Sequence, residues 1–314
     1  NKGAELIIDH EFGNVRCENW DRDYISILAT VRVKTKNSEK AAQIIDNIVI
    51  AVKGNRNKVE AVCDLNQKYR KNKISVNIDF DIKMPATINL NLESKFGSVY
   101  VESVSGTANI SSEYGSLEII SLDNRTNNIE IGFGDGKIKH IANGSIEVGY
   151  SHFSIGAAEE LSIETEYSDI NIGKAKTISL ELEGGNATIG DVTDFEVESS
   201  FANIEIQSVS GSLTGETQYG SLNVSKIMTG FSVINLVNEF GALTFNVEKG
   251  ASYKINADGK YCSIDYPGGE AKISYSNKSN SSTVIKGVVG KETDPKSSIS
   301  VRSESGAVNI QTTK

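Results

Sequence analysis

The chain has 314 residues, of which 38% are hydrophobic and 28 are glycine, and this composition excludes wholesale disorder. A chain of this length exceeds the size at which single compact cores usually stop growing, so we expect either two domains or an elongated repeat. The formal net charge is −9, and residues 93–270 alone carry 10 basic and 26 acidic side chains, which excludes a nucleic-acid partner because phosphate binding needs a basic surface.

Residues 1–92 alternate apolar and polar positions in the manner of strands, with one exception. Strands are expected at 24–34, 47–53, 58–65 and 74–82. The exception is 38–46, where Ala41, Ile44, Ile45 and Ile48 have helical spacing and Asn37 or Ser38 can cap the start. We therefore expect an irregular, strand-rich N-terminal cap with one short helix, continuous with the residues C-terminal to it. A basic stretch at residues 68–73 is typical of a solvated hairpin.

Residues 93–270 contain a repeat. Its signature is an aromatic residue, a small residue, a small polar residue and then alternating apolar positions, and successive copies start 17 to 21 residues apart. The copies start at Phe96, Tyr114, Phe133, Tyr150, Tyr167, Gly184, Phe201, Tyr219, Phe240 and Tyr261, with glycine replacing the aromatic residue at 184. Each copy predicts two short strands that bury one face and meet at a corner. Units this short have no room for a crossover helix, so they must stack as coils. The sequence predicts an all-β fold, a right-handed parallel β-helix (β-solenoid).

The corners of the repeat carry two expectations about packing. The small residue after each aromatic is expected to adopt a positive φ and to leave little room for a Cβ. The aromatic side chains share the phase of the inward residues, so they are expected to form a buried ladder rather than an exposed sugar-binding platform. On that basis, Tyr167→Ala is expected to destabilise the protein by about 3–5 kcal/mol.

Residues 271–314 are expected to form C-terminal strands and a second cap. A polar stretch from Ser276 to Thr283 precedes a last copy of the signature at Ser305. The chain contains three cysteines, Cys17, Cys63 and Cys262, with no metal-ligand spacing. We interpret them as buried thiols, with a Cys17–Cys63 bridge as the alternative. No apolar run is long enough to cross a bilayer, so no transmembrane segment is expected.

Candidate binding residues can be identified from the register of the repeat. Three residues before each corner, six consecutive coils carry a glutamate: Glu130, Glu147, Glu164, Glu181, Glu198 and Glu216. These positions are out of phase with the inward residues, so they should form one exposed acidic column at the strand spacing of about 4.8 Å. Like charges at that spacing repel. The column is therefore either a solvated polar face or a site for a weakly held divalent cation or a basic partner.

Catalytic motifs are lacking. His10, His140 and His152 are scattered without metal spacing, and no nucleophile with a base, phosphate loop or zinc pattern occurs. Asp135, Asp169 and Asp191 could act as paired carboxylates of a polysaccharide-active enzyme, but they fall at corners where aspartate is an ordinary turn residue. We expect no catalytic residues, no metal site and no cofactor.

Three segments resemble a known family. The stretch from Phe80 to Leu90, leading into Phe96-Gly97-Ser98-Val99-Tyr100-Val101, resembles the strand, proline and Gly-Ser-Val pattern of the bacterial putative-adhesin domains of unknown function. The start of that family is similar to Glu11–Val15 followed by Trp20. The resemblance implies a right-handed β-helix, export to the envelope and no established catalytic residues.

The expected function is that of a non-enzymatic exported cell-surface or envelope protein, an adhesin or binding module for a surface protein or glycan. The first residue, Asn1, fits a mature form whose export signal has been removed. The alternatives are a structural or stress-sensing envelope component and, least favoured, a polysaccharide-active β-helix enzyme.

Overall fold

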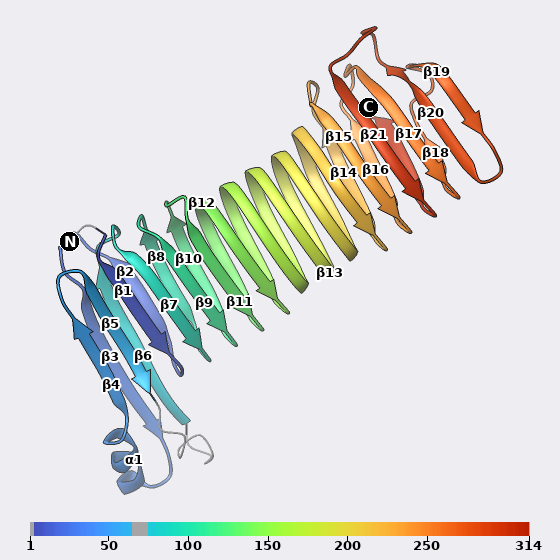
Figure 1. Ribbon diagram of the computed structural model, residues 1–314. Helices are drawn as coiled ribbons and strands as arrows, with labels where there is room; N and C mark the ends of the chain where they lie inside the picture. Colours follow the sequence, from blue (N-terminus) through green and yellow to red (C-terminus); the bar gives the residue numbers. More distant parts are fainter. Residues whose placement is uncertain (1–2, 65–74, 314) are drawn as a thin grey trace. The chain divides into compact units, whose positions relative to one another are not determined.

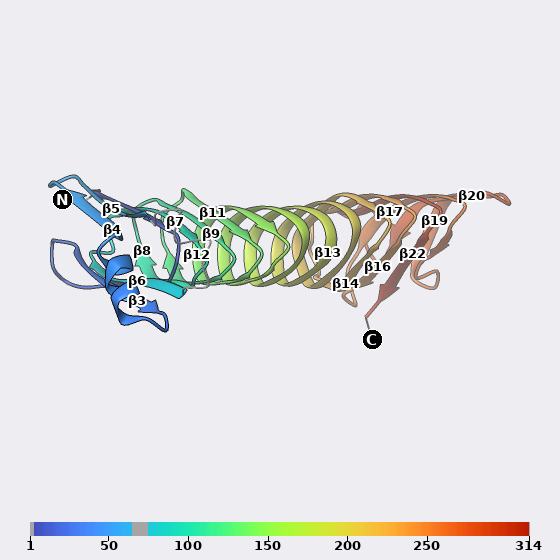
Figure 2. The ribbon, with the colours of Figure 1, turned by 90° about the horizontal axis from the view of Figure 1, so that it is seen from below.

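The computed structural model describes residues 3–64 and 75–313, and the chain divides into two compact units, residues 1–155 and 156–314. The described residues are all-β apart from one helix, which confirms the expected class (Figures 1 and 2). None of the helical structure described is long and apolar enough to cross a bilayer. The basic stretch at 68–73 lies outside the described residues, and the expected division at residues 92 and 270 stays a prediction.

Unit 1 contains two ladders of strands, which meet in the long strand β12. The first runs in the order β4 (Val49–Gly54), β5 (Lys58–Asp64), β1 (Glu5–His10), β7 (Asn89–Lys95), β9 (Ala108–Glu113), β11 (Asn127–Gly132) and β12 (Asp135–Gly149). The second runs in the order β3 (Ser26–Lys34), β6 (Ser75–Met84), β2 (Val15–Asn19), β8 (Val99–Val104), β10 (Ser116–Leu122) and β12. Neighbours are parallel except in the pairs β4–β5 and β3–β6, so the sheet is mixed.

The expected N-terminal elements are confirmed. Helix α1 (Ser38–Ile45) begins after Asn37, whose side chain accepts a hydrogen bond from the backbone N–H of Lys40 at 3.1 Å. The helix buries Ile44 and contacts β3, beside which it is seen in Figure 2. The four predicted strands correspond to β3, β4, β5 and β6.

Unit 2 has the same plan. The strand β13 (His152–Gln218), most of which lies in this unit, is followed in one ladder by β15 (Val233–Glu239), β21 (Ser297–Glu304), β17 (Tyr253–Lys260), β20 (Ser282–Val289) and β19 (Ala271–Lys278). In the other ladder it is followed by β14 (Ser221–Ile227), β16 (Ala242–Val247), β22 (Ala307–Thr312) and β18 (Ser263–Asp265). Among the described strands of this unit, only the pairs β17–β20 and β20–β19 are antiparallel.

Both ends of the chain are inserted between strands that are distant in sequence. In unit 1, β1 pairs with β5 on one side and β7 on the other, and β2 lies likewise between β6 and β8. In unit 2, β21 lies between β15 and β17, and β22 lies between β16 and β18. The terminal strands therefore have hydrogen-bonded neighbours on both sides.

The core of each unit is made by alternate residues of the strands, mainly Ile, Leu and Val. Cys17 and Cys63 belong to it as buried reduced thiols, and Cys262 is a half-buried reduced thiol, so the alternative of a Cys17–Cys63 bridge is wrong. Burial raises the pKa of the Cys17 thiol to about 12.

The corners contradict two expectations. The positive φ belongs to the nine aromatic residues themselves, at 48° to 56°, and not to glycines such as Gly97 and Gly115 that follow them. The aromatic rings are 47% to 66% exposed, so the expectation of a buried ladder is wrong. The physical reason is that a left-handed residue breaks the period-two alternation and turns its side chain away from the core. The cost of about 3–5 kcal/mol expected for Tyr167→Ala is therefore also wrong, because this ring is 58% exposed.

Candidate functional site

The first ladder of unit 1 carries an open groove of about 670 Å³ across β1, β7, β9, β11 and β12. Its strands are parallel and in register, so outward side chains at equivalent positions form rows that cross them. Two of these rows are polar, and a third row at the neighbouring corner is aromatic.

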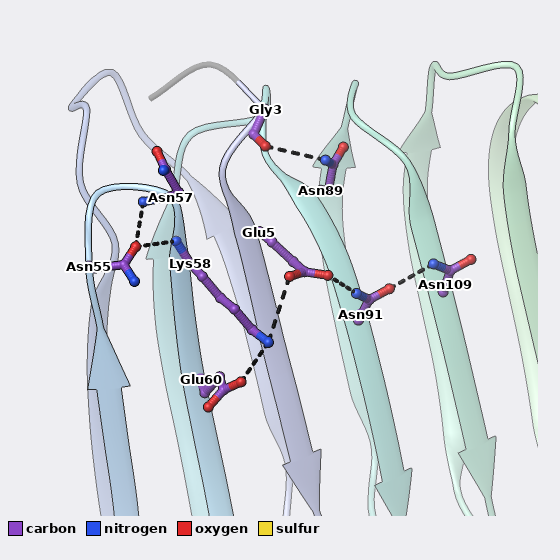
Figure 3. A network of polar contacts seen from close by, with 9 residues as sticks. All are labelled: Gly3, Glu5, Asn55, Asn57, Lys58, Glu60, Asn89, Asn91 and Asn109. Atoms are coloured by element: carbon purple, nitrogen blue, oxygen red, sulfur yellow. Dashed lines mark hydrogen bonds and ion pairs between the residues drawn. The ribbon is translucent and has the colours of Figure 1, made fainter.

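The first row consists of asparagine amides, which are hydrogen-bonded to one another (Figure 3). Asn109 Nδ2 donates to Asn91 Oδ1 at 2.6 Å, and Asn91 Nδ2 donates to Glu5 Oε1 at 2.6 Å. Asn128 extends the row by donating to Asn109 Oδ1 at 3.0 Å. Each carboxamide has two donor hydrogens and two acceptor lone pairs. The row therefore keeps further hydrogen-bonding capacity for a ligand while its own geometry is held.

The second row is acidic. Asp9, Glu93, Ser111, Glu130 and Glu147 occupy equivalent positions on successive strands. Of the predicted column, Glu130 and Glu147 lie here and are exposed as expected. Burial, and then the negative charges of Glu93 and Glu11, raise the pKa of Asp9.

Sequence analysis missed Asp9 and Glu93 although a signal existed. Counting three residues back from Phe12 and Phe96, the same rule that gave the column, finds both of them. The acidic row has a basic neighbour in Lys95, whose Nζ lies 3.1 Å from Glu93 Oε1 and forms an ion pair with it.

The other four predicted glutamates, Glu164, Glu181, Glu198 and Glu216, lie on β13 in unit 2 and are exposed. The last three line a hollow of about 450 Å³ together with Glu196. Across residues 3–64 and 75–313, no three His, Cys, Asp or Glu side chains are grouped so as to hold a metal ion. The divalent-cation hypothesis therefore gains no support from the arrangement, and a binding role for the column stays a prediction.

The aspartates considered for catalysis make contacts along rows. Asp169 Oδ1 accepts from Asn186 Nδ2 at 2.9 Å, and Asp191 Oδ1 accepts from Ser208 Oγ at 2.6 Å. Asp135 Oδ1 lies 3.8 Å from His152 Nδ1, and both side chains are largely exposed. These contacts give each of the three carboxylates a partner at the equivalent position of the next repeat copy or close to it.

The aromatic row of unit 1 is a stacked ladder. Phe12, Phe96, Tyr114, Phe133 and Tyr150 follow one another with ring centroids 5.0 to 5.3 Å apart and planes within 13° of parallel. In unit 2, Phe201, Tyr219 and Phe240 stack in the same way, at 4.8 and 5.0 Å. Within such a ladder the rings cover one another's faces, so their edges and the tyrosine hydroxyls meet the solvent.

The backbone at these corners does not require an aromatic residue. A positive φ costs a residue with a Cβ about 1–2 kcal/mol relative to glycine. Gly184 and Ser305 adopt the same left-handed conformation, at φ 69° and 55°, where the other turns have a ring. A half-exposed ring recovers only part of its burial free energy. The ladder is thus more aromatic than the fold needs, which makes it a candidate for contact with a ligand.

Two glycines leave an open strip between the acidic row and the ladder. Gly132 and Gly149 are paired on β11 and β12, and a Cβ added to either would meet no atom within 4 Å. Packing therefore gives no reason for glycine at these positions. Glycine within a strand often marks a place where another molecule approaches the backbone closely.

No protein-family model matches the chain, and no curated protein matches it in sequence. The family resemblance noted in the sequence therefore stays a prediction. Among solved structures, one described as a putative cell adhesion protein from Clostridium sporogenes is similar over 99% of this chain and 93% of its own, with 11% identity and a TM-score of 0.18. At that score the likeness supports no argument about fold or function.

Proposed function

We propose that this protein is a non-enzymatic binding module of the cell surface or envelope, an adhesin in the broad sense, whose ligand lies along the groove of unit 1. The observation that carries the proposal is the exposed aromatic ladder, retained at corners where glycine or serine suffices for the fold. The amide row and the acidic row beside it supply hydrogen-bonding groups at the spacing of the strands.

A neutral glycan is the ligand class that this surface fits best. Sugar hydroxyls can donate to the carboxylates and both donate to and accept from the amides. The repetition of equivalent groups along the groove suits a polymer that repeats its own hydroxyls. The acidic row would repel polyanionic glycans. An adhesin that binds a surface protein through the same face is the alternative that remains if no glycan binds the parent.

Two further parts of the proposal concern architecture and location. We propose that the parallel ladders of each unit close into right-handed β-solenoid coils of 17–21 residues, which is supported by the parallel pairing of strands from successive copies, such as β8 with β10 and β9 with β11, and by the general right-handedness of parallel crossovers. Export to the envelope is proposed on the family resemblance alone.

The test is a glycan-binding assay with the full chain. A panel of neutral, amine-bearing and polyanionic glycans would be compared for the parent and for two variants, which we call the groove variants. One is Tyr114→Gly/Phe133→Gly, in the aromatic ladder beside the groove, and the other is Glu130→Gln/Glu147→Gln, in the lining of the groove. Glu118→Gln is the matched control, because Glu118 is exposed on the other ladder of the same unit. We expect neutral glycans to bind the parent and the control, and both groove variants to bind them at least about tenfold more weakly.

Three outcomes would contradict this proposal. Failure of every glycan to bind the parent would reject a glycan-binding module. Binding that survives both groove variants would move the site elsewhere. Release of new reducing ends from a bound glycan would favour the polysaccharide-active enzyme over a binding module.

A further inference from the structure

The aromatic ladder of unit 2 is interrupted at Gly184. Tyr167 and Phe201 hold the same corner 17 residues before and after it. The three turns are in register here, since Asn186 Nδ2 donates to Asp169 Oδ1 at 2.9 Å and Asn203 Nδ2 donates to Asn186 Oδ1 at 3.4 Å. One ring is therefore missing between two turns that each have one.

The interruption leaves one ring face without its usual neighbour. Phe201 stacks on Tyr219 on one side, at 4.8 Å and within 5° of parallel, and Gly184 occupies the corner on its other side. Phe201 is accordingly 66% exposed, against 47% for Tyr219, which has rings on both sides. The ring of Tyr167 leans over Gly184, because a Cβ there would lie 2.8 Å from Tyr167 Cδ1.

Polar groups border the open face on both sides. On one side lie the exposed carboxylates of Glu183 and Glu166, one residue before the corner on their turns. On the other side lies the row Asp169, Asn186, Asn203, which ends in Ser221 Oγ donating to Asn203 Oδ1 at 2.8 Å. An apolar ring face framed by amides and carboxylates is the combination that a sugar ring needs, with C–H groups on its face and hydroxyls around its edge.

We propose that Gly184 and Phe201 form a subsite for one pyranose ring of a neutral glycan. The sugar stacks on the open face of Phe201, at the position of a ring at 184, once the ring of Tyr167 that leans over Gly184 moves back, and its hydroxyls bond to Asn186, Asn203 and Glu183. An aromatic side chain of a partner protein fits less well, because it would desolvate these polar groups without bonding to them. An acidic sugar is excluded by Glu183, Glu166 and Asp169.

This subsite rests on the proposed function for its ligand class, but it lies in unit 2 and shares no residue with the groove of unit 1. Filling the gap tests it directly. Gly184→Phe should complete the ladder, because nine aromatic residues adopt this left-handed corner and the flexible ring of Tyr167 can move back. Phe201→Gly removes the stacking face instead, at a corner where Gly184 shows that glycine is accepted.

The experiment measures binding of cellohexaose and mannohexaose, with oligogalacturonate as the polyanionic comparison, by calorimetry and saturation-transfer NMR on the full chain. Each substitution is made both in the parent and in the Glu130→Gln/Glu147→Gln background, so that binding in the groove and binding outside it can be followed separately. We expect each to weaken binding of a neutral oligosaccharide about tenfold, and Glu205→Gln, an exposed change two residues beyond Asn203 on the same ladder and further from the corner, to leave it unchanged.

The outcomes separate the two proposals. Neutral-glycan binding that persists in both Gly184→Phe and Phe201→Gly but is lost in the groove variants overturns the subsite and spares the groove. Binding that is lost in these two variants and unaffected by the groove variants supports the subsite and overturns the groove. If Gly184→Phe does not fold, Phe201→Gly decides the matter, and the absence of any glycan binding by the parent overturns both.

Discussion

The carbonyl oxygen of Gly97 occupies the space that a side chain on Gly115 would need, since a Cβ at Gly115 would lie 1.7 Å from it. The same approach recurs between Gly115 and Gly134, at 1.9 Å, and between Gly13 and Gly97, at 1.6 Å. Successive copies of the repeat in unit 1 therefore touch backbone to backbone at the corner that carries the aromatic ladder.

We expect Gly115→Ala to destabilise unit 1 by about 1–3 kcal/mol, because the backbone of one turn must move to admit the methyl group. Ser151 occupies the position equivalent to Gly115 in a later copy of the repeat, so the corner can be built to hold a small side chain. This limits the loss of stability that we expect for Gly115→Ala. Gly132→Ala is the control, since its Cβ would meet no atom within 4 Å, and it should be neutral or stabilising by about 0.5–1 kcal/mol. If urea unfolding shows that Gly115→Ala and Gly132→Ala lower the free energy of unfolding equally, the backbone contact at Gly115 is contradicted.

Removing one ring from the ladder should cost little stability. In Tyr114→Gly, the relief of a left-handed residue, about 1–2 kcal/mol, offsets the loss of stacking, about 0.5–1.5 kcal/mol. Leu117→Ala, three residues away in the core, should cost about 2–5 kcal/mol. If thermal unfolding shows that the two changes cost the same, the ring has a structural role that its exposure does not reveal.

The sequence predicts the strands and the repeat because alternation and spacing are local properties. It places Glu130 and Glu147 outward correctly for the same reason, since both lie within regular strands. The direction of the rings could not be predicted by that rule, because one left-handed residue at the corner reverses the phase. The insertion of β1 and β21 was also missed, since a repeat period relates neighbours in sequence and carries no information on which turn is adjacent in space.

The buried side chain of Asn238 should contribute more than a surface amide. It accepts a hydrogen bond from Thr217 Oγ1 at 3.0 Å and donates to Ser303 Oγ at 3.0 Å and to the carbonyl oxygen of Gly241 at 3.1 Å. We expect Asn238→Ala to cost about 1–3 kcal/mol, because it leaves buried polar atoms without a partner. Asn256→Ala removes an exposed bond to Ser300 and should change the free energy of unfolding by less than about 0.5 kcal/mol. Equal urea midpoints for the two variants would refute this role.

The raised pKa of Asp9 predicts a pH dependence of stability. The folded protein holds this proton more tightly than the unfolded chain does, so stability falls as pH rises through the window that begins near the ordinary pKa of 3.8. Asp9→Asn should therefore melt higher than the parent at neutral pH, and the difference should vanish below that window. Glu93→Gln, which removes one of the repelling charges, should make the pH dependence smaller. A difference between Asp9→Asn and the parent that does not change with pH would refute the titration of this carboxyl.

The three thiols should differ in reactivity towards a maleimide. Cys262 is half-buried, whereas Cys17 and Cys63 are buried and the pKa of Cys17 is raised to about 12. We expect one thiol to react in the native protein and three after denaturation, with Cys262→Ser abolishing the native reaction. Rapid native labelling of Cys17 would show that the core of unit 1 opens more readily than its packing indicates.

The inserted strands constrain the order in which the chain can assemble as it is synthesised. β21 and β22 are synthesised after β15, β16, β17 and β18, yet β15 and β17 need β21 between them, and β16 and β18 need β22. Until Ser297–Thr312 emerge, β15 and β17 both expose an open parallel edge, and their direct pairing would be a compact but incorrect state. Completion of unit 2 therefore requires either that this gap stays open or that a premature pairing reverses, so residues 297–312 act as a checkpoint on folding.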